Sequence, residues 1–195
     1  MTDKPVILDL CGGTGAWSRP WAESGEYDVR VITLPEHDVR TYQPPEEVYG
    51  ILAAPPCTYF CVMRNCRGKP TKEQLTKGLL VVEACMRIIW KCQPTFWALE
   101  NPRGTLHRWL GEPQLKFQPS DYGDPWTKGT CIWGNFKKPL KFFPVKSCGM
   151  LIPGNMKSLI FKTKDGKYIR GVNRSVTSPG FAKAFFEANR IINRA

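Results

Sequence analysis

Residues 5–15 read PVILDLCGGTG, an apolar run that ends in Asp9 and Leu10 and leads directly into a glycine-rich turn. A short apolar run before glycines is typical of a buried parallel strand. Similar runs follow at 28-DVRVITL-34 and 49-YGILAA-54, and a fourth at 95-TFWALEN-101 again ends in polar side chains. These four segments are therefore expected to be strands.

Helical patterns lie between the expected strands. Thr71 and Gln74 resemble a capping box, and the apolar positions that follow keep the helical period to about Cys92. Residues 16–24 are expected to form a shorter helix. Alternation of strands and helices predicts an α/β fold with a mostly parallel central sheet and helices on both faces.

Three polar clusters stand where expected strands end. They are the glycine turn at 12–15, the Pro-Pro-Cys step at 55–57, and the pair Glu100 and Asn101. In open α/β sheets, ligands bind beyond the carboxyl ends of the strands. We therefore expect these three clusters to line one crevice.

Length and charge narrow the class of protein. A chain of 195 residues favours one domain, and its net charge of +11 indicates a polyanionic partner, with nucleic acid ahead of a membrane surface. No apolar run is long enough for a membrane span, and Asp3 and Asp9 argue against a signal peptide.

Because neither a signal peptide nor a membrane span is expected, the protein is expected to stay in a reducing cytoplasm, where disulfides are rare. Eight cysteines are present, and we expect most of them to be free thiols. A metal site is not expected, because no Cys-x-x-Cys pair occurs and the only histidines are His37 and His107. Cys61, Cys85 and Cys92 are interpreted as packing residues, as are Trp17 and Trp21.

Most of the positive charge lies in one segment. Residues 137–174 hold eight Lys and two Arg but a single acid, Asp165, for a local net charge of +9. Within this segment, Asp165-Gly166 separates two strand-like arms and predicts a β-hairpin at 159–172. The chain is therefore predicted to be one domain with a small basic appendage.

The motifs 9-DLCGGTG-15, 54-APPC-57 and 99-LENP-102 stand in a recognisable order. With these motifs in this order, the chain resembles the S-adenosylmethionine-dependent cytosine-C5 DNA methyltransferases. The resemblance covers about residues 6–136 and resumes near 173–186. The Pro-Pro-Cys step, followed some forty residues later by Glu-Asn, is the specific part of the resemblance. It implies a Rossmann-like methyltransferase fold and methyl transfer to carbon 5 of cytosine in DNA.

The resemblance also implies catalytic roles. Carbon 5 of cytosine is a poor nucleophile until a thiolate adds at carbon 6, which is the role expected of Cys57. Glu100 is expected to donate a proton at ring nitrogen 3, and Asn101 to hold the same edge of the base. Lys128 or Thr130 is expected to contact the base or its phosphate. The sequence names no base for the carbon 5 proton.

The cofactor positions follow from the same resemblance. Asp9, Cys11, Gly13 and Gly15 would surround the methionine and ribose, and Asp38 would accept from the adenine amino group. Further expected cofactor contacts are Pro55, Ser175 and Val176. The chain departs from the family at Cys11, where an aromatic residue is usual, at Pro35, where a ribose-binding acid is expected, and at Gly129, where an arginine is expected.

The segment expected to bind DNA is shorter than the target-recognition domain that is usual in the family. Only about forty residues stand where a target-recognition domain is usual, so the basic hairpin is expected to serve, with short or relaxed sequence specificity. The irregular segment 57–70 is placed to close over a flipped-out base. The expected DNA contacts are Arg64, Arg67, Arg103, Lys162, Lys164, Lys167 and Arg170.

Two alternatives remain open at this stage. One is the same chemistry on RNA or on a cytosine nucleotide. The other is a catalytically silent nucleic-acid-binding protein with this fold, which the substitutions at Cys11, Pro35 and Gly129 motivate. For the hairpin itself, the alternative is a solvated surface element. No oligomer is implied.

Overall fold

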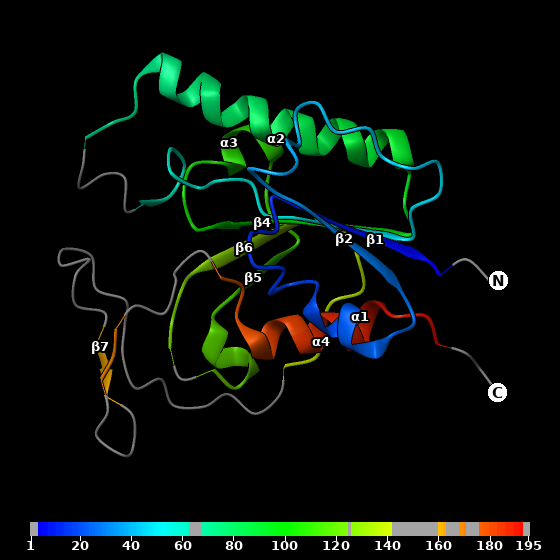
Figure 1. The fold of residues 1–195 in the computed structure, drawn as a ribbon. Helices are drawn as coiled ribbons and strands as arrows, with labels where there is room; N and C mark the ends of the chain where they lie inside the picture. The colour runs from blue at the N-terminus through cyan, green and yellow to red at the C-terminus, as the bar shows by residue number, and fades with distance from the viewer. Residues whose placement is uncertain are drawn as a thin grey trace.

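The computed structural model describes residues 4–62, 68–124, 126–141, 160–162, 168–170 and 176–192. A six-stranded sheet in the order β2-β1-β3-β4-β6-β5 forms its centre (Figure 1). The strands are β1 Val6–Leu10, β2 Asp28–Ile32, β3 Gly50–Ala53, β4 Phe96–Pro102, β5 Leu115–Phe117 and β6 Thr130–Asn135.

Four neighbouring strands run parallel, because β1 pairs in parallel with β2 and β3, and β3 with β4. Strand β6 lies between β4 and β5 and is antiparallel to both. All four strands expected from the sequence are present, and the prediction of a mostly parallel sheet is confirmed.

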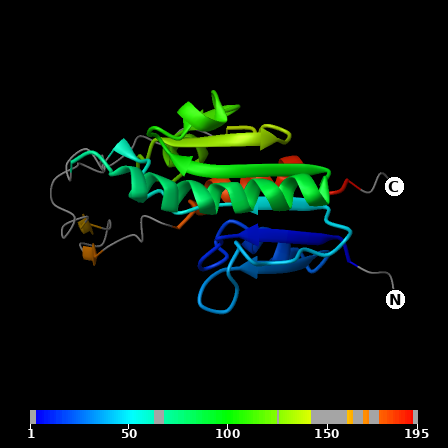
Figure 2. The same ribbon diagram turned by 90° about the horizontal axis from the view of Figure 1, so that it is seen from above.

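Helices cover both faces of the sheet, as predicted (Figures 1 and 2). Helices α2 and α3 lie on one face, and α1 and α4 lie on the other. Their bounds are α1 Arg19–Ser24, α2 Lys72–Cys92, α3 His107–Leu110 and α4 Pro179–Asn189, and a short 3-10 helix, η2, spans Pro119–Tyr122.

Helix α2 begins with the predicted capping box. The Thr71 hydroxyl accepts from the Gln74 amide, and the Gln74 side chain accepts from the Thr71 amide. The helix ends at Cys92, followed by Gln93 in the left-handed conformation. Both ends agree with the sequence pattern.

Each face of the sheet has its own core. The α2 side is aliphatic, with Ile51, Ile88 and Leu99 fully buried. The α1 and α4 side is aromatic, and Trp17 and Trp21 lie within it at 2% and 0% exposure, which confirms their interpretation as packing residues. Their rings contact Phe185, with a centroid separation of 5.5 Å for Trp17.

The predicted basic hairpin is present in the described backbone. Strand β7, Ile160–Lys162, pairs antiparallel with β8, Tyr168–Arg170, with Phe161 opposite Ile169. The turn between them lies outside the described residues. Among the helices that the structure describes, none has both the length and the apolar character of a membrane span.

Candidate active site

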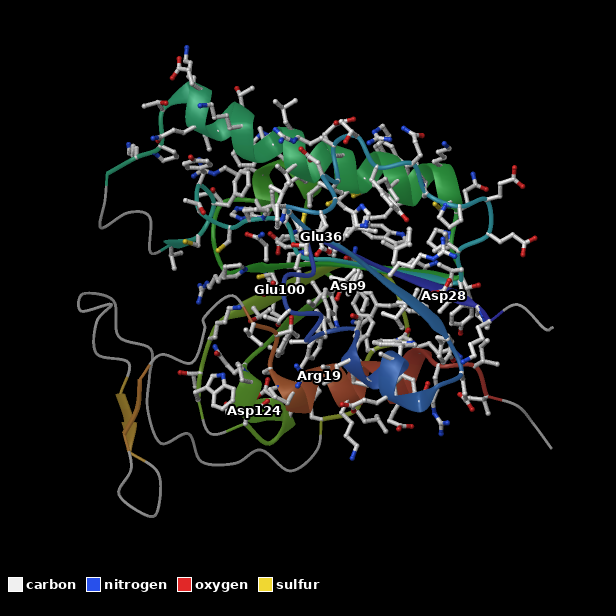
Figure 3. The ribbon with its side chains drawn as sticks, in the orientation of Figure 1. Asp9, Arg19, Asp28, Glu36, Glu100 and Asp124 are labelled. Atoms are coloured by element: carbon white, nitrogen blue, oxygen red, sulfur yellow. The ribbon has the colours of Figure 1, made fainter. Side chains whose placement is uncertain are left out.

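The strand register brings the three polar clusters to one edge of the sheet. Leu10 lies opposite Ala53, and Ala53 lies opposite Leu99. The residues that follow, at positions 11, 54 and 100, therefore leave three neighbouring parallel strands side by side. Figure 3 labels Asp9 and Glu100, which come from β1 and β4 of this edge.

Cys57 begins a tight turn that carries a second thiol. Its carbonyl accepts from the amides of Phe60 at 3.0 Å and Cys61 at 3.1 Å, and its side chain hydrogen bonds with that of Cys61. Both cysteines are partly exposed as residues. The hydrogen bond with Cys61, together with burial, raises the pKa of the Cys57 thiol far above its ordinary value, whereas the charge of Lys128 acts to lower it.

Glu100 and Lys128 form an ion pair beside this turn. Glu100 is only 7% exposed, and Lys128 Nζ lies 3.4 Å from its Oε1. Lys128 stands just before β6, and β6 pairs with β4, so the antiparallel insertion brings the two together. A small cavity lined by Glu100 and Lys128 also reaches Trp126 and Val176.

Asn101 holds the loop that carries Cys57. Its side chain is fully buried, and its Nδ2 donates to the carbonyl of Pro55 at 2.9 Å. The bond satisfies the buried amide donor, whereas Oδ1 has no hydrogen-bond partner among the described residues. Contact of Asn101 with the base stays a prediction.

Asp9 lies beneath the glycine turn. Its carboxyl is 0% exposed, Ser18 Oγ donates to Oδ2 at 2.6 Å, and Oδ1 has no hydrogen-bond partner among the described residues. Burial raises the pKa of Asp9 to about 6. A Cβ atom at Gly12 would overlap this carboxyl, so the loop needs glycine there.

The backbone of the glycine turn is open to a ligand. Gly13 and Gly15 adopt left-handed φ values of 56° and 67°, and no atom approaches within 4 Å of the position where a Cβ of Gly13 would be. Backbone free of side chains permits close approach of a ligand. The unpartnered Asp9 oxygen adds a buried acceptor for an ammonium or hydroxyl donor.

Cys11 and Asp38, which were expected to lie near the cofactor's ribose and adenine, already have hydrogen-bond partners within the protein. The Cys11 thiol hydrogen bonds with Cys85 of α2, which lowers the pKa of Cys11, and it supplies no flat surface for stacking. The Asp38 carboxylate accepts from Arg40 Nε at 2.9 Å, and this contact lowers the pKa of Asp38 to about 2. A ligand amino group would have to share that carboxylate with Arg40.

The expected DNA contacts are only partly described. Arg103 is exposed, and its amide donates to the Gly129 carbonyl at 2.7 Å. A Cβ at Gly129 would lie 3.4 Å from the Arg103 Cβ, so Arg103 borders the space where the family pattern expects an arginine. Lys162 and Arg170 end the two hairpin strands. The expected DNA contacts outside the described part are Arg64, Arg67, Lys164 and Lys167, and the expected cofactor contact Ser175 also lies outside it.

Three residues of the site were not found by sequence reasoning. Cys61 was assigned to packing, although its four-residue spacing from Cys57 is a usable signal for a shared turn. No role was expected for Ser18, and the structure shows its Oγ donating to Asp9. Nothing in the sequence pointed to Trp126 beside Glu100.

The chain is similar to a viral protein. It is 30% identical over 163 residues to a protein of Frog virus 3 (isolate Goorha) named "Probable DNA (cytosine-5)-methyltransferase", and the match covers 73% of this chain and 74% of the viral protein. This chain belongs to the DNA (cytosine-5)-methyltransferase family. It is thus a member of an enzyme family, as the resemblance implied.

A solved structure is also similar to this methyltransferase family member. It is described as a candidate DNA modification methyltransferase encoded within an E. coli prophage, with a TM-score of 0.47 and 18% identity. The match covers 68% of this chain and 47% of that chain, so the present chain spans about half the length of the prophage protein. No model of a protein family matches the chain.

Proposed function

We propose that this protein transfers a methyl group from S-adenosylmethionine to carbon 5 of cytosine in DNA, through a covalent adduct of Cys57. The observation that carries the proposal is the strand register, which sets the Cys57 loop beside a buried Glu100 that is paired with Lys128. We further propose that residues 1–195 act as one methyltransferase domain, with 137–174 as its DNA-contacting region.

In the proposed mechanism, the Cys57 thiolate adds to carbon 6 of the base, and the ring electrons move toward nitrogen 3. Glu100 donates a proton at nitrogen 3, which leaves carbon 5 electron-rich. S-adenosylmethionine, when bound, supplies the electrophilic methyl group that carbon 5 takes. Loss of the carbon 5 proton and of the thiolate then restores the aromatic ring.

Lys128 faces both the proposed nucleophile and the proposed acid. Its charge lowers the pKa of Cys57, and its ammonium lies 3.4 Å from the Glu100 carboxylate. A cation near a thiol stabilises the thiolate that attacks the base. Asn101 acts through the loop, because its bond to Pro55 fixes the backbone that presents Cys57.

The cofactor would lie over the glycine turn. Asp9, Gly13 and Gly15 would hold its methionine part, and Val176 lines the cavity that reaches Glu100. Pro55, Ser175 and Cys11 complete the proposed contacts, and Asp38 would reach the adenine amino group.

The DNA would be bound mainly through its phosphates, with short or relaxed sequence specificity. The net charge of +11 supports this mode, since Lys and Arg contacts to phosphates supply affinity without sequence information. The target cytosine must leave the duplex stack, which costs a few kcal/mol. Arg64, Arg67 and Arg103 are the proposed DNA contacts near that base. The hairpin residues are proposed to contact the DNA farther from it.

Transfer of label from S-adenosylmethionine to duplex DNA tests the proposal, in wild type and in Cys57→Ala. We expect incorporation at cytosine by the wild type and a loss of at least about 1,000-fold in Cys57→Ala, because removal of a covalent nucleophile abolishes the main route. Cys92→Ala, which removes a thiol from the far end of α2, serves as the matched control and should keep wild-type activity.

Equal incorporation by wild type and Cys57→Ala would remove Cys57 from the mechanism. Duplex RNA and free cytidine nucleotides are tested in parallel arms. Label in either of these arms and none in DNA would contradict the proposed substrate while leaving the chemistry intact.

A further inference from the structure

The nucleophile proposed above has a second thiol within hydrogen-bonding distance. Cys57 and Cys61 lie four residues apart, and the Cys61 amide donates to the Cys57 carbonyl at 3.1 Å, which places both side chains on one turn. Both are half-buried and both are free thiols. A catalytic thiol that is in contact with a second thiol can be oxidised to a disulfide rather than to irreversible products.

The turn is anchored to the strand that carries Glu100. The Thr105 amide donates to the Phe60 carbonyl at 2.7 Å, and the Val62 amide donates to the Arg103 carbonyl at 3.1 Å. Cys61 forms a β-bridge with Gly104, just after β4. A change in the shape of this turn is therefore transmitted to the segment that follows Glu100 and Asn101.

A second thiol pair in the molecule provides an internal comparison. Cys11, at the glycine turn, hydrogen bonds with Cys85, which is 0% exposed within the core under α2. A solute must cross that core to reach Cys85, whereas neither Cys57 nor Cys61 is fully buried. The Cys57–Cys61 pair is thus the one of the two pairs in which both cysteines are partly exposed.

We propose that Cys57 and Cys61 form a redox modification site, at which hydrogen peroxide or a related peroxide makes a reversible disulfide that blocks the nucleophile. The Cys57 sulfur attacks one peroxide oxygen, the O–O bond breaks, and water leaves to give a sulfenic acid. The Cys61 sulfur then displaces a second water and forms the S–S bond. In the overall reaction, two thiols and one hydrogen peroxide are converted to one disulfide and two waters.

The geometry makes this disulfide easy to reduce. Side chains four apart on a helical turn have Cβ atoms about 5–6 Å apart, whereas a disulfide brings them to about 3.8 Å. Oxidation therefore tightens the turn, and a strained disulfide has a more oxidising potential than a relaxed one. A thiol reductant should restore the resting turn. The loss of methyl transfer rests on the proposed function, but the disulfide itself does not.

Peptide mapping after mild hydrogen peroxide treatment of the folded protein tests the proposal directly. Both thiols lie between Arg40 and Arg64, so one tryptic peptide holds both, and the disulfide lowers its mass by about 2 Da. We expect this loss before any change at Cys85, and reversal by dithiothreitol. In the same samples, methyl transfer should fall by roughly tenfold or more and recover on reduction.

Cys61→Ser separates a resolving thiol from a packing residue. This variant should keep its fold, and its untreated activity serves as its own baseline; peroxide should drive Cys57 to sulfinic acid, with a loss of activity relative to that baseline that dithiothreitol does not reverse. Cys92→Ser should behave as wild type. Recovery of Cys61→Ser on reduction, or oxidation of Cys85 before Cys57, would overturn the proposal. A disulfide in a protein that never methylates DNA would refute the proposed function alone, because the mass change needs no methylation.

Discussion

The Cys57 thiol is held in its protonated form at rest. Its pKa lies far above the ordinary value, first because of the hydrogen bond with Cys61 and then because of burial, while Lys128 opposes both. A thiol in this state attacks slowly. The proposed nucleophile therefore depends on its neighbours for activation, and the two neighbours act in opposite directions.

Replacement of Cys61 by alanine should lower the pKa of Cys57, because the largest cause of its rise is removed. The rate of iodoacetamide alkylation at Cys57, followed by peptide mapping from pH 6 to pH 10, should then rise at a lower pH than in the wild type. Lys128→Met should shift the profile the other way. Superimposable profiles for wild type and Cys61→Ala would mean that the thiol contact does not control the proton.

Asp9 makes stability depend on pH in the opposite sense to a paired surface carboxylate. Its folded-state pKa, about 6, lies above the ordinary 3.8, so the folded state binds the proton more tightly than the unfolded chain does. Its contribution is complete below pH 3.8 and is lost as the pH rises through 6. At neutral pH the buried charge therefore costs stability, which is a cost expected at a binding site.

Asp9→Asn should remove this dependence. Between pH 5 and pH 7.5 the Asp9 carboxyl costs the wild type on the order of 1 kcal/mol in the free energy of unfolding, and the variant should not show this component. Urea unfolding of both proteins at the two pH values measures the difference, and Asn retains an acceptor for Ser18. An identical pH dependence in both proteins would contradict the burial of an ionisable Asp9.

At this scale, the sequence predicts which residues gather but not what each one touches. Cys57, Glu100 and the glycine turn were placed at one edge from strand patterns, and the register confirms that edge. The partners Pro55 for Asn101 and Ser18 for Asp9 follow from tertiary packing, for which local pattern carries no signal. Their roles in catalysis and cofactor binding remain predictions.

Among the elements, α2 is the one whose start is best defined by sequence. Thr71→Ala should destabilise the protein by about 1 kcal/mol, because the capping hydroxyl for the Gln74 amide is lost. Thr76→Ala is the matched control on the exposed face of the same helix and should be neutral or slightly stabilising, since alanine is the better helix former. Urea denaturation compares the two, and equal effects would argue against the cap.

Strands β5 and β6 are the ones that the sequence pattern missed. Strands β1 to β4 carry strong apolar runs before polar ends, so their positions were predictable. Strands β5 and β6 were not predicted as elements, and the insertion of β6 between β4 and β5 is set by pairing across the fold. Because β6 pairs with β4, Lys128 lies next to Glu100, and the sequence pattern could not predict this ion pair.

At the scale of the whole molecule, the net charge of +11 bears on how DNA is bound. If DNA is bound through phosphates, the logarithm of the binding constant should fall linearly with the logarithm of the salt concentration. Changing Lys162, Lys164, Lys167 and Arg170 to Gln should reduce the slope by up to about 3–4, because each lost phosphate contact contributes about 0.9. Fluorescence anisotropy with a labelled duplex at several salt concentrations measures both slopes.

The matched control for that experiment removes equal charge elsewhere. Gln substitutions at Lys4, Arg30, Lys91 and Arg190 should leave the slope near its wild-type value. Lys4 and Arg30 line a cavity on the amino-terminal side of the sheet, and the same cavity reaches Cys92, next to Lys91. Equal changes in slope for the two variants would mean that the hairpin is a solvated surface element.

The most direct test of the central claim is covalent capture of Cys57 by DNA that contains 5-fluorocytosine. Fluorine at carbon 5 cannot leave as a proton does, so an adduct at carbon 6 persists after methyl transfer. Intact mass measurement after incubation with S-adenosylmethionine should show wild type attached to the duplex through Cys57, and Cys57→Ser unattached. An unmodified wild-type protein that nonetheless methylates ordinary DNA would contradict the claim.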